Sequence, residues 1–133
     1  MAGKNEITSE KVTVNIGFVD LGQIDLLVQE GFYSNRTDMI RTAIRNQLAI
    51  HSDVVKQTVS QKTFTLGMRH YTKIELEKMR EQGIKLEIQV VGLVSIADDV
   101  TPELAFETIE SLVVLGAFHA PDVIKKILKD KIL

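Results

Sequence analysis

The stretch Lys11-Val12-Thr13-Val14-Asn15-Ile16 alternates polar and apolar side chains. This period of two is the signature of a β-strand that buries one of its faces. A single short strand cannot bury Val12, Val14 and Ile16, and no second strand follows in this part of the chain. The economical partner is the same strand of a second chain, paired antiparallel about a two-fold axis. The sequence therefore predicts a dimer built on a two-stranded ribbon.

Two helices are predicted after this strand. From Val19 onward the apolar period becomes helical, and Gly31 supplies a stop. The second helix begins near Ser34 or Asn35, where Asn35 and Asp38 form a variant of the capping box. The order of elements in this half is therefore strand, helix, tight turn and helix.

The polar side chains of the strand face away from its apolar side. In the predicted ribbon Lys11, Thr13 and Asn15 point outward together with their counterparts from the second chain. A two-stranded ribbon fits the major groove of B-DNA, where Lys donates to guanine and Asn pairs with adenine. The strand therefore carries side chains suited to reading base edges.

The region from Glu10 to His51, about a third of the chain, resembles the CopG/Arc/MetJ ribbon-helix-helix family. The likeness lies in Val12–Ile16, in the helix end before Tyr33, and above all in Gly31–Arg41. In that family the outward strand residues read bases, and the start of the second helix holds a DNA phosphate on its unpaired amides. The resemblance implies that the base readers are Lys11, Thr13 and Asn15, and that the phosphate-binding residues are Ser34, Asn35 and Arg36.

Composition narrows the class of protein. The chain has 133 residues, is 44% hydrophobic and contains no cysteine, which excludes disulfides and thiolate metal sites. No apolar run approaches the roughly 20 residues that span a bilayer, and the polar N-terminus predicts no secretory signal, so we expect a cytoplasmic protein. The net charge of −2 is unlike that of a broadly basic DNA-binding domain. Any positive charge that meets DNA must therefore be local.

The second half predicts a small α/β domain, so the expected fold class is α+β: an N-terminal ribbon-helix-helix dimer followed by this domain. The expected domains are residues 1–52, a linker or helix extension at 53–62, and 63–133. The pattern predicts a strand at 63–68, a helix at 72–82, a strand at 85–96 and then two helices. The first of these begins at Thr101-Pro102 and is closed by Gly116, and the second opens at Pro121. No internal repeat is visible.

The C-terminal domain shows no catalytic or cofactor motif, so the chain is not expected to be an enzyme and no cofactor is predicted. Some ribbon-helix-helix regulators carry a nickel sensor, but His51, His70 and His119 are scattered along this sequence, so no metal site is expected. The apolar segment around Leu112–Phe118, interpreted as helical, favours self-association. We therefore expect an oligomerisation or effector domain.

The function predicted from the sequence is that of a sequence-specific transcriptional regulator, a repressor. Its partner is double-stranded DNA with a pseudo-palindromic operator, because the protein dimer has a two-fold axis. A tetramer assembled through the C-terminal domain is left open. Two alternatives also remain: an antitoxin of a toxin–antitoxin pair that regulates its own operon, and a protein-interaction module that has lost DNA binding.

Overall fold

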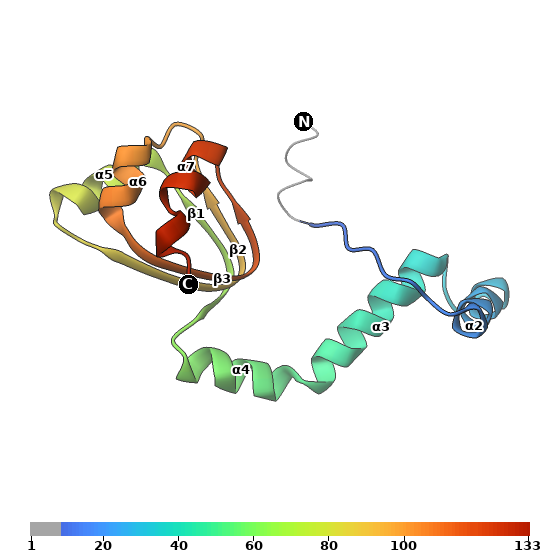
Figure 1. Cartoon of the computed structure of the whole chain (residues 1–133). Helices are drawn as coiled ribbons and strands as arrows, with labels where there is room; N and C mark the ends of the chain where they lie inside the picture. The colour runs from blue at the N-terminus through green and yellow to red at the C-terminus, as the bar shows by residue number, and fades with distance from the viewer. Residues whose placement is uncertain (1–8) are drawn as a thin grey trace. The chain divides into compact units, whose positions relative to one another are not determined.

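The protein is described by a computed structural model that covers residues 9–133 (Figure 1). The polar N-terminus and the start of the first predicted domain, residues 1–8, lie outside the described residues. The described chain divides into two compact units: an N-terminal unit of residues 11–58, and a C-terminal unit of residues 59–133 with which Ser9 and Glu10 are grouped. No helix within the described part is long and apolar enough to cross a membrane.

The N-terminal unit consists of an extended segment and two helices. Residues 11–16 are extended but carry no assigned strand in the single chain. The helices are α2 (Phe18–Gln29) and α3 (Arg36–Ile50), as the sequence predicted. Between them the chain turns at Gly31, whose φ of +86° is favourable only for glycine.

A separate helix, α4 (Ser52–Gln61), follows α3. His51 forms the C-cap of α3, and its backbone at φ −96° and ψ 8° interrupts the helix before α4 begins. The polar stretch after Ser52, for which the sequence left a linker and a helix extension open, is thus helical but is not a continuation of α3.

The C-terminal unit alternates strands and helices. Its strands form a three-stranded parallel sheet in the order β1-β2-β3. Figure 1 shows the helices on one side of this sheet. The elements are β1 (Thr65–Tyr71), α5 (Lys73–Glu81), β2 (Leu86–Ile96), α6 (Pro102–Thr108), β3 (Ile109–His119), α7 (Asp122–Ile127) and a 3-10 turn at Lys129–Lys131.

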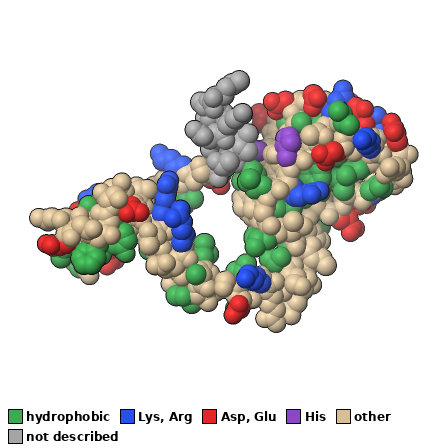
Figure 2. Space-filling model, turned by 180° about the vertical axis from the view of Figure 1, so that it is seen from behind, with side chains coloured by type: hydrophobic (Ala, Val, Ile, Leu, Met, Phe, Trp, Pro, Cys, Tyr) green, Lys and Arg blue, Asp and Glu red, His purple; other side chains and the backbone are tan. Residues whose placement is uncertain are grey.

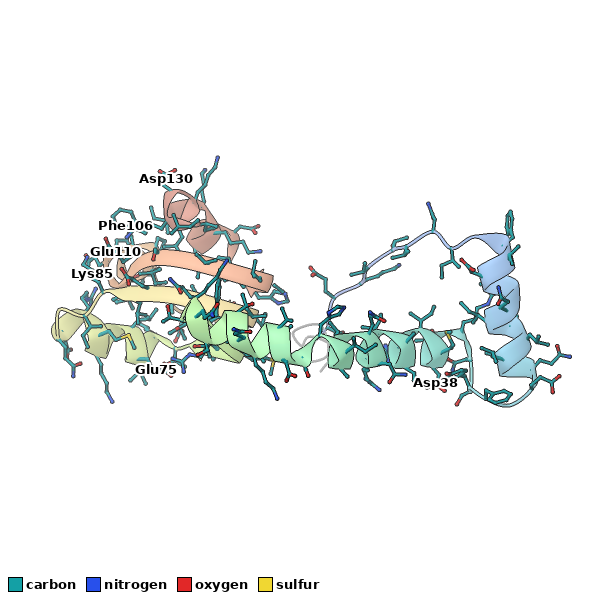
Figure 3. The ribbon with its side chains drawn as sticks, turned by 90° about the horizontal axis from the view of Figure 1, so that it is seen from below. Asp38, Glu75, Lys85, Phe106, Glu110 and Asp130 are labelled. Carbon is teal, nitrogen blue, oxygen red and sulfur yellow. The ribbon has the colours of Figure 1, made fainter. Side chains whose placement is uncertain are left out.

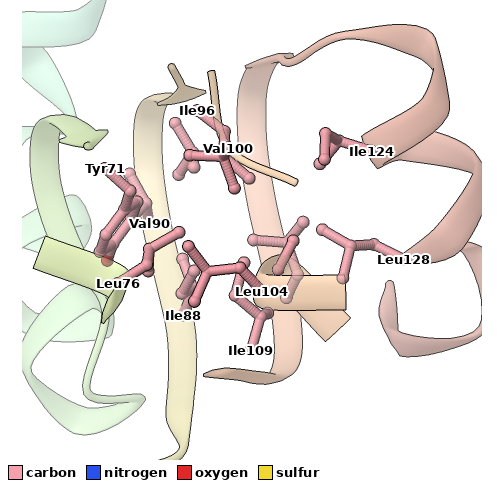
Figure 4. Packing of buried hydrophobic residues seen from close by; sticks show 13 residues of the cluster. Tyr71, Leu76, Ile88, Val90, Ile96, Val100, Leu104, Ile109, Ile124 and Leu128 are labelled. Atoms are coloured by element: carbon pink, nitrogen blue, oxygen red, sulfur yellow. The ribbon is translucent and has the colours of Figure 1, made fainter. Parts of the chain in front are cut away.

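The core of this unit lies between the sheet and its helices (Figure 4). Each helix contributes at least one fully buried aliphatic side chain: Leu76 from α5, Leu104 and Ala105 from α6, and Ile124 from α7. These pack against inward-facing residues of the strands, among them Val90, Val94 and Leu112. The sheet is therefore covered on one face by the helices of its own chain.

The predicted helix between Thr101 and Gly116 is wrong beyond Thr108. The start is as expected, because Thr101 accepts from the amide of Leu104 and Pro102 occupies the first turn. The chain then becomes β3 directly, and Ile109–His119 pairs in parallel with β2. A short apolar run has no decisive period, and here pairing with β2 determines the strand. The apolar segment Leu112–Phe118 is accordingly strand and not helix.

The fold contains an internal repeat that is not visible in the sequence. Each of the three repeats is a strand, a short loop and a helix, and each strand carries a glycine at the same register: Gly67, Gly92 and Gly116. Sequence similarity among the repeats is confined to such isolated positions. Repeats of this kind stack so that each one contacts its neighbours, which builds a continuous core.

The glycine row forms a crease across the sheet. The φ values are +138°, +139° and +124°, a region that side chains with a Cβ rarely adopt. A Cβ at Gly92 would lie 2.0 Å from the carbonyl oxygen of Gly67, and a Cβ at Gly116 would lie 2.0 Å from that of Gly92. Nothing lies within 4 Å of a Cβ at Gly67. The backbone of this row therefore leaves no room for a side chain at Gly92 on β2 or at Gly116 on β3.

Alanine substitutions in this row should separate backbone strain from steric clash. Gly67→Ala introduces strain alone and should lower the free energy of unfolding by about 1–3 kcal/mol. Gly92→Ala adds a clash with the neighbouring carbonyl, so we expect a loss on the order of 4–5 kcal/mol. Urea unfolding, combined with hydrogen exchange of the β2 amides, measures both. Equal effects of the two substitutions would contradict the close approach of the Gly67 carbonyl to Gly92.

Candidate nucleic-acid interface

The predicted base-reading segment is exposed along its whole length. Lys11, Thr13 and Asn15 are all exposed, and so are the apolar residues between them. Val12 is 78% exposed and Val14 is 71% exposed within the single chain. The apolar surface of these valines is therefore exposed to solvent. The backbone of residues 11–16 forms no hydrogen bond with another described residue.

The N-terminal unit has almost no core of its own. Within residues 11–58, all of which the structure describes, Ile24 alone is buried. Large apolar side chains remain at the surface on the extended segment and both helices, and Figure 2 shows apolar side chains at the surface of this unit. They include Phe18, Val19, Leu26, Phe32, Ile44 and Leu48. Burial among residues 11–58 therefore contributes little to the stability of this unit.

The start of α3 is closed by a reciprocal pair of hydrogen bonds. The side-chain oxygen of Asn35 accepts from the amide of Asp38 at 2.8 Å, and the Asp38 carboxylate accepts from the amide of Ser34 at 3.0 Å. This confirms the predicted variant of the capping box, in which the carboxylate binds the amide of the residue before the N-cap; Figure 3 labels Asp38 at this helix end. The cap gives the amide of Asp38 an acceptor. The amides of Arg36 and Thr37 lie before the first intrahelical hydrogen bond and have no acceptor within the helix. Two donors therefore remain at the positive end of the helix dipole.

Arg36 lies at this helix start but is already engaged. Its guanidinium donates from Nε and Nη2 to the two carboxylate oxygens of Asp25 at 2.7 and 2.8 Å. This hydrogen bond lowers the pKa of Asp25 and raises that of Arg36. The pair links α2 to α3, and its contribution to stability is lost as the pH falls through the lowered pKa of Asp25. It fixes the position of Arg36 and leaves Nη1 outside the bidentate pair.

Two further arginines lie beside the same helix start. Arg41 and Arg45 line a surface hollow of about 340 Å³ together with Ser34, Asn35, Thr37 and Asp38. Neither arginine forms an ion pair in the described part of the chain. Their spacing of one helical turn is visible in the sequence. The structure thus places positive charge locally, as the overall net charge of −2 requires.

The comparison with known families identifies the class of protein. A profile of the ribbon-helix-helix transcriptional regulator family matches residues 7–125, which is most of the chain. The chain belongs to this family. Searches of curated proteins and of solved structures gave no match. The match includes β1, β2 and β3, so the family assignment covers the C-terminal unit as well as the N-terminal unit.

Membership of the ribbon-helix-helix family makes this chain a DNA-binding transcriptional regulator.

Within the described residues no group of three or more His, Asp or Glu side chains is arranged to hold a metal ion. His70 and His119, scattered in sequence, nevertheless lie in register on either side of Ser95 at one end of the sheet. Only the pairing of the strands could have revealed this row.

Asn35→Ala tests whether the Asn35 side chain stabilises the start of α3 as its N-cap. Losing the N-cap should destabilise the two-helix unit by about 0.5–2 kcal/mol, whereas Asn35→Ser should retain most of the stability. Asn46→Ala, in the middle of the same helix, is the matched control and should be neutral or slightly stabilising. Thermal unfolding followed by circular dichroism measures all three. Equal destabilisation by both alanine substitutions would argue against the capping role.

Proposed function

We propose that this protein is a homodimeric repressor that acts in the cytoplasm and reads the major groove with an antiparallel β-ribbon. The observation that carries the proposal is the exposed segment Lys11–Ile16, which has alternating valines and no strand partner among residues 9–133. Pairing with the same segment of a second chain buries Val12 and Val14 and satisfies the backbone groups along the ribbon. It also places Lys11, Thr13 and Asn15 of both chains on one face.

In the proposed complex these polar side chains specify sequence. Lys11 donates to guanine, Asn15 forms a bidentate pair with adenine, and Thr13 contacts either base. Because the ribbon has a two-fold axis, the operator is pseudo-palindromic. Binding at an operator that overlaps a promoter would exclude polymerase, which is the basis for proposing repression.

The start of α3 positions the ribbon on the DNA backbone. The amides at the helix start and the side chains of Ser34, Asn35 and Arg36 hold a phosphate, which sets the register without reading sequence. The hollow lined by Arg41 and Arg45 supports including both arginines in this contact. Such a footprint is compatible with an acidic chain because only the local charge meets DNA.

The antitoxin alternative receives less support. A tail that wraps around a toxin is expected to be polar and disordered, whereas residues 65–131 contain a parallel sheet with a buried aliphatic core. No described feature favours an antitoxin over a regulator whose second unit serves assembly.

Single substitutions in the ribbon should alter sequence preference. Lys11→Ala and Asn15→Ala should each cost about 1–3 kcal/mol of binding free energy per lost base contact and relax the preference at one operator position. Gel shifts on sites selected from a random library measure both effects. Lys56→Ala, an exposed lysine on α4, is the charge-matched control. If both ribbon variants bind the selected sites as the native protein does, the ribbon does not read DNA.

Substitution of the arginines on α3 should weaken binding to all sequences equally. Arg41→Ala removes two phosphate contacts per dimer, so the slope of log K against log salt should become shallower by roughly 2. Arg45→Ala should behave similarly, and Arg80→Ala on α5 is the control for net charge. Salt titrations of binding provide the slopes. A sequence-dependent loss, or slopes identical to that of Arg80→Ala, would remove these arginines from the backbone contact.

A further inference from the structure

The face of the three-stranded sheet opposite the helices is apolar and is not covered by any helix. Its central belt consists of residues from all three strands: Leu66, Met68, Val91, Leu93, Val113, Leu115 and Ala117. On the two edge strands Leu66 and Leu115 are each 57% exposed and Met68 is 66% exposed, whereas the central Leu93 is 7% exposed. Ser9 and Glu10 of the same chain line the hollow at the centre of this face and leave its edges open. Parallel sheets are normally covered on both faces, and an apolar patch of this kind marks an interface.

Polar side chains border this belt at both ends of the strands. At the carboxyl ends lie His70, Ser95 and His119, with His70 Nδ1 2.6 Å from Ser95 Oγ. At the opposite end lie Glu87 and Gln89 of β2. An apolar centre bordered by polar residues is the usual anatomy of a protein–protein interface.

We infer that this sheet face packs against the same face of the second chain in the ribbon-held dimer, with the strands of the two sheets antiparallel. The inference rests on the proposed function to the extent that the ribbon brings the two chains together. Face-to-face sheets keep their strand directions within about 30° and pack about 10 Å apart. The two-fold axis would lie along the glycine row, at the centre of the belt.

The polarity of the two ends decides the orientation. With antiparallel strands and the axis on the glycine row, the row of His70, Ser95 and His119 lies over the end that holds the partner's Gln89, and the two copies of Glu87 lie at opposite ends of the interface. With parallel strands the two copies of Glu87 would face each other, and this juxtaposition of like charges is unfavourable. The antiparallel arrangement also places the belt of one copy directly on the belt of the other.

The size of the face indicates why the partner belongs to the same dimer. A three-stranded patch about 14 Å wide and roughly 30 Å long offers on the order of 400 Å² per copy. Two copies therefore bury about 800 Å², less than the roughly 1,200–2,000 Å² of a stable independent interface. Chains joined by the ribbon meet at an effective concentration on the order of millimolar, at which such a face can close.

The cysteine-free chain permits a direct test. Leu115→Cys in the full-length protein should be cross-linked within the dimer by a bismaleimide that spans the ~10 Å between packed sheets. Ile74→Cys, 67% exposed on α5, is the matched control and should cross-link several-fold less. Met68→Cys tests the opposite edge strand and should behave as Leu115→Cys does. Circular dichroism verifies that each variant is folded.

A further cysteine tests the orientation. In the antiparallel arrangement the two copies of Gln89 lie about 20 Å apart along the strands, so Gln89→Cys should not cross-link. In the parallel arrangement they face each other and would cross-link efficiently. Efficient reaction at Gln89 would therefore overturn the proposed orientation.

Sedimentation and DNA binding of the same samples separate this inference from the proposed function. A dimer that binds DNA, but in which neither Leu115→Cys nor Met68→Cys cross-links above Ile74→Cys, refutes the sheet interface and leaves the ribbon intact. A monomer at micromolar concentration refutes the ribbon itself. Cross-linking that rises with concentration and yields species larger than a dimer would place the partner face in another dimer and would overturn the assignment.

Discussion

The N-terminal unit cannot bury its own apolar side chains, and the rest of the protein's behaviour depends on this constraint. Two helices and an extended segment leave Ile24 as the one buried residue in positions 11–58. Hydrophobic burial is the main term that offsets conformational entropy, and residues 11–58 bury little apolar surface among themselves, which is why we propose a second chain as the partner of this unit. The need for a partner and the proposed ability to read a two-fold operator thus have the same physical origin.

The C-terminal unit, in contrast, buries apolar side chains within its own chain. It repeats one strand–helix motif and buries an aliphatic residue from each helix, as with Leu76, Leu104 and Ile124. This arrangement completes a core within one chain but covers only one face of the sheet. The exposed belt around Leu115 is the surface that remains, and the crease at Gly67, Gly92 and Gly116 crosses it at its centre.

Positive charge is concentrated on α3 in the N-terminal unit. The chain as a whole is slightly acidic, yet Arg36, Arg41 and Arg45 all lie on α3. One of them is held by Asp25, which orients it and screens its charge. The other two line the hollow at the helix start. In the proposed dimer this small positive footprint is doubled, which takes the place of a broadly basic surface.

Features that depend on neighbouring residues could be predicted from the amino-acid sequence. The capping box of Asn35 and Asp38, the turn at Gly31 and the two helices around it follow from spacings of three or four residues, and the fold agrees with them. The family resemblance of Gly31–Arg41 was recognisable for the same reason, and the family match supports it. The alternation in Lys11–Ile16 also predicted that a partner strand is required, and that partner remains a proposal.

Only the tertiary structure decided the features that depend on strand pairing. The run Leu112–Leu115 has no decisive period, and its position beside β2 makes it a strand. Gly116, which had indicated the end of a helix, is instead part of the crease, because its backbone approaches Gly92 too closely for any side chain. The alignment of His70 with His119 likewise exists only across three paired strands. These contacts join residues far apart in the chain, and local sequence carries no signal for them.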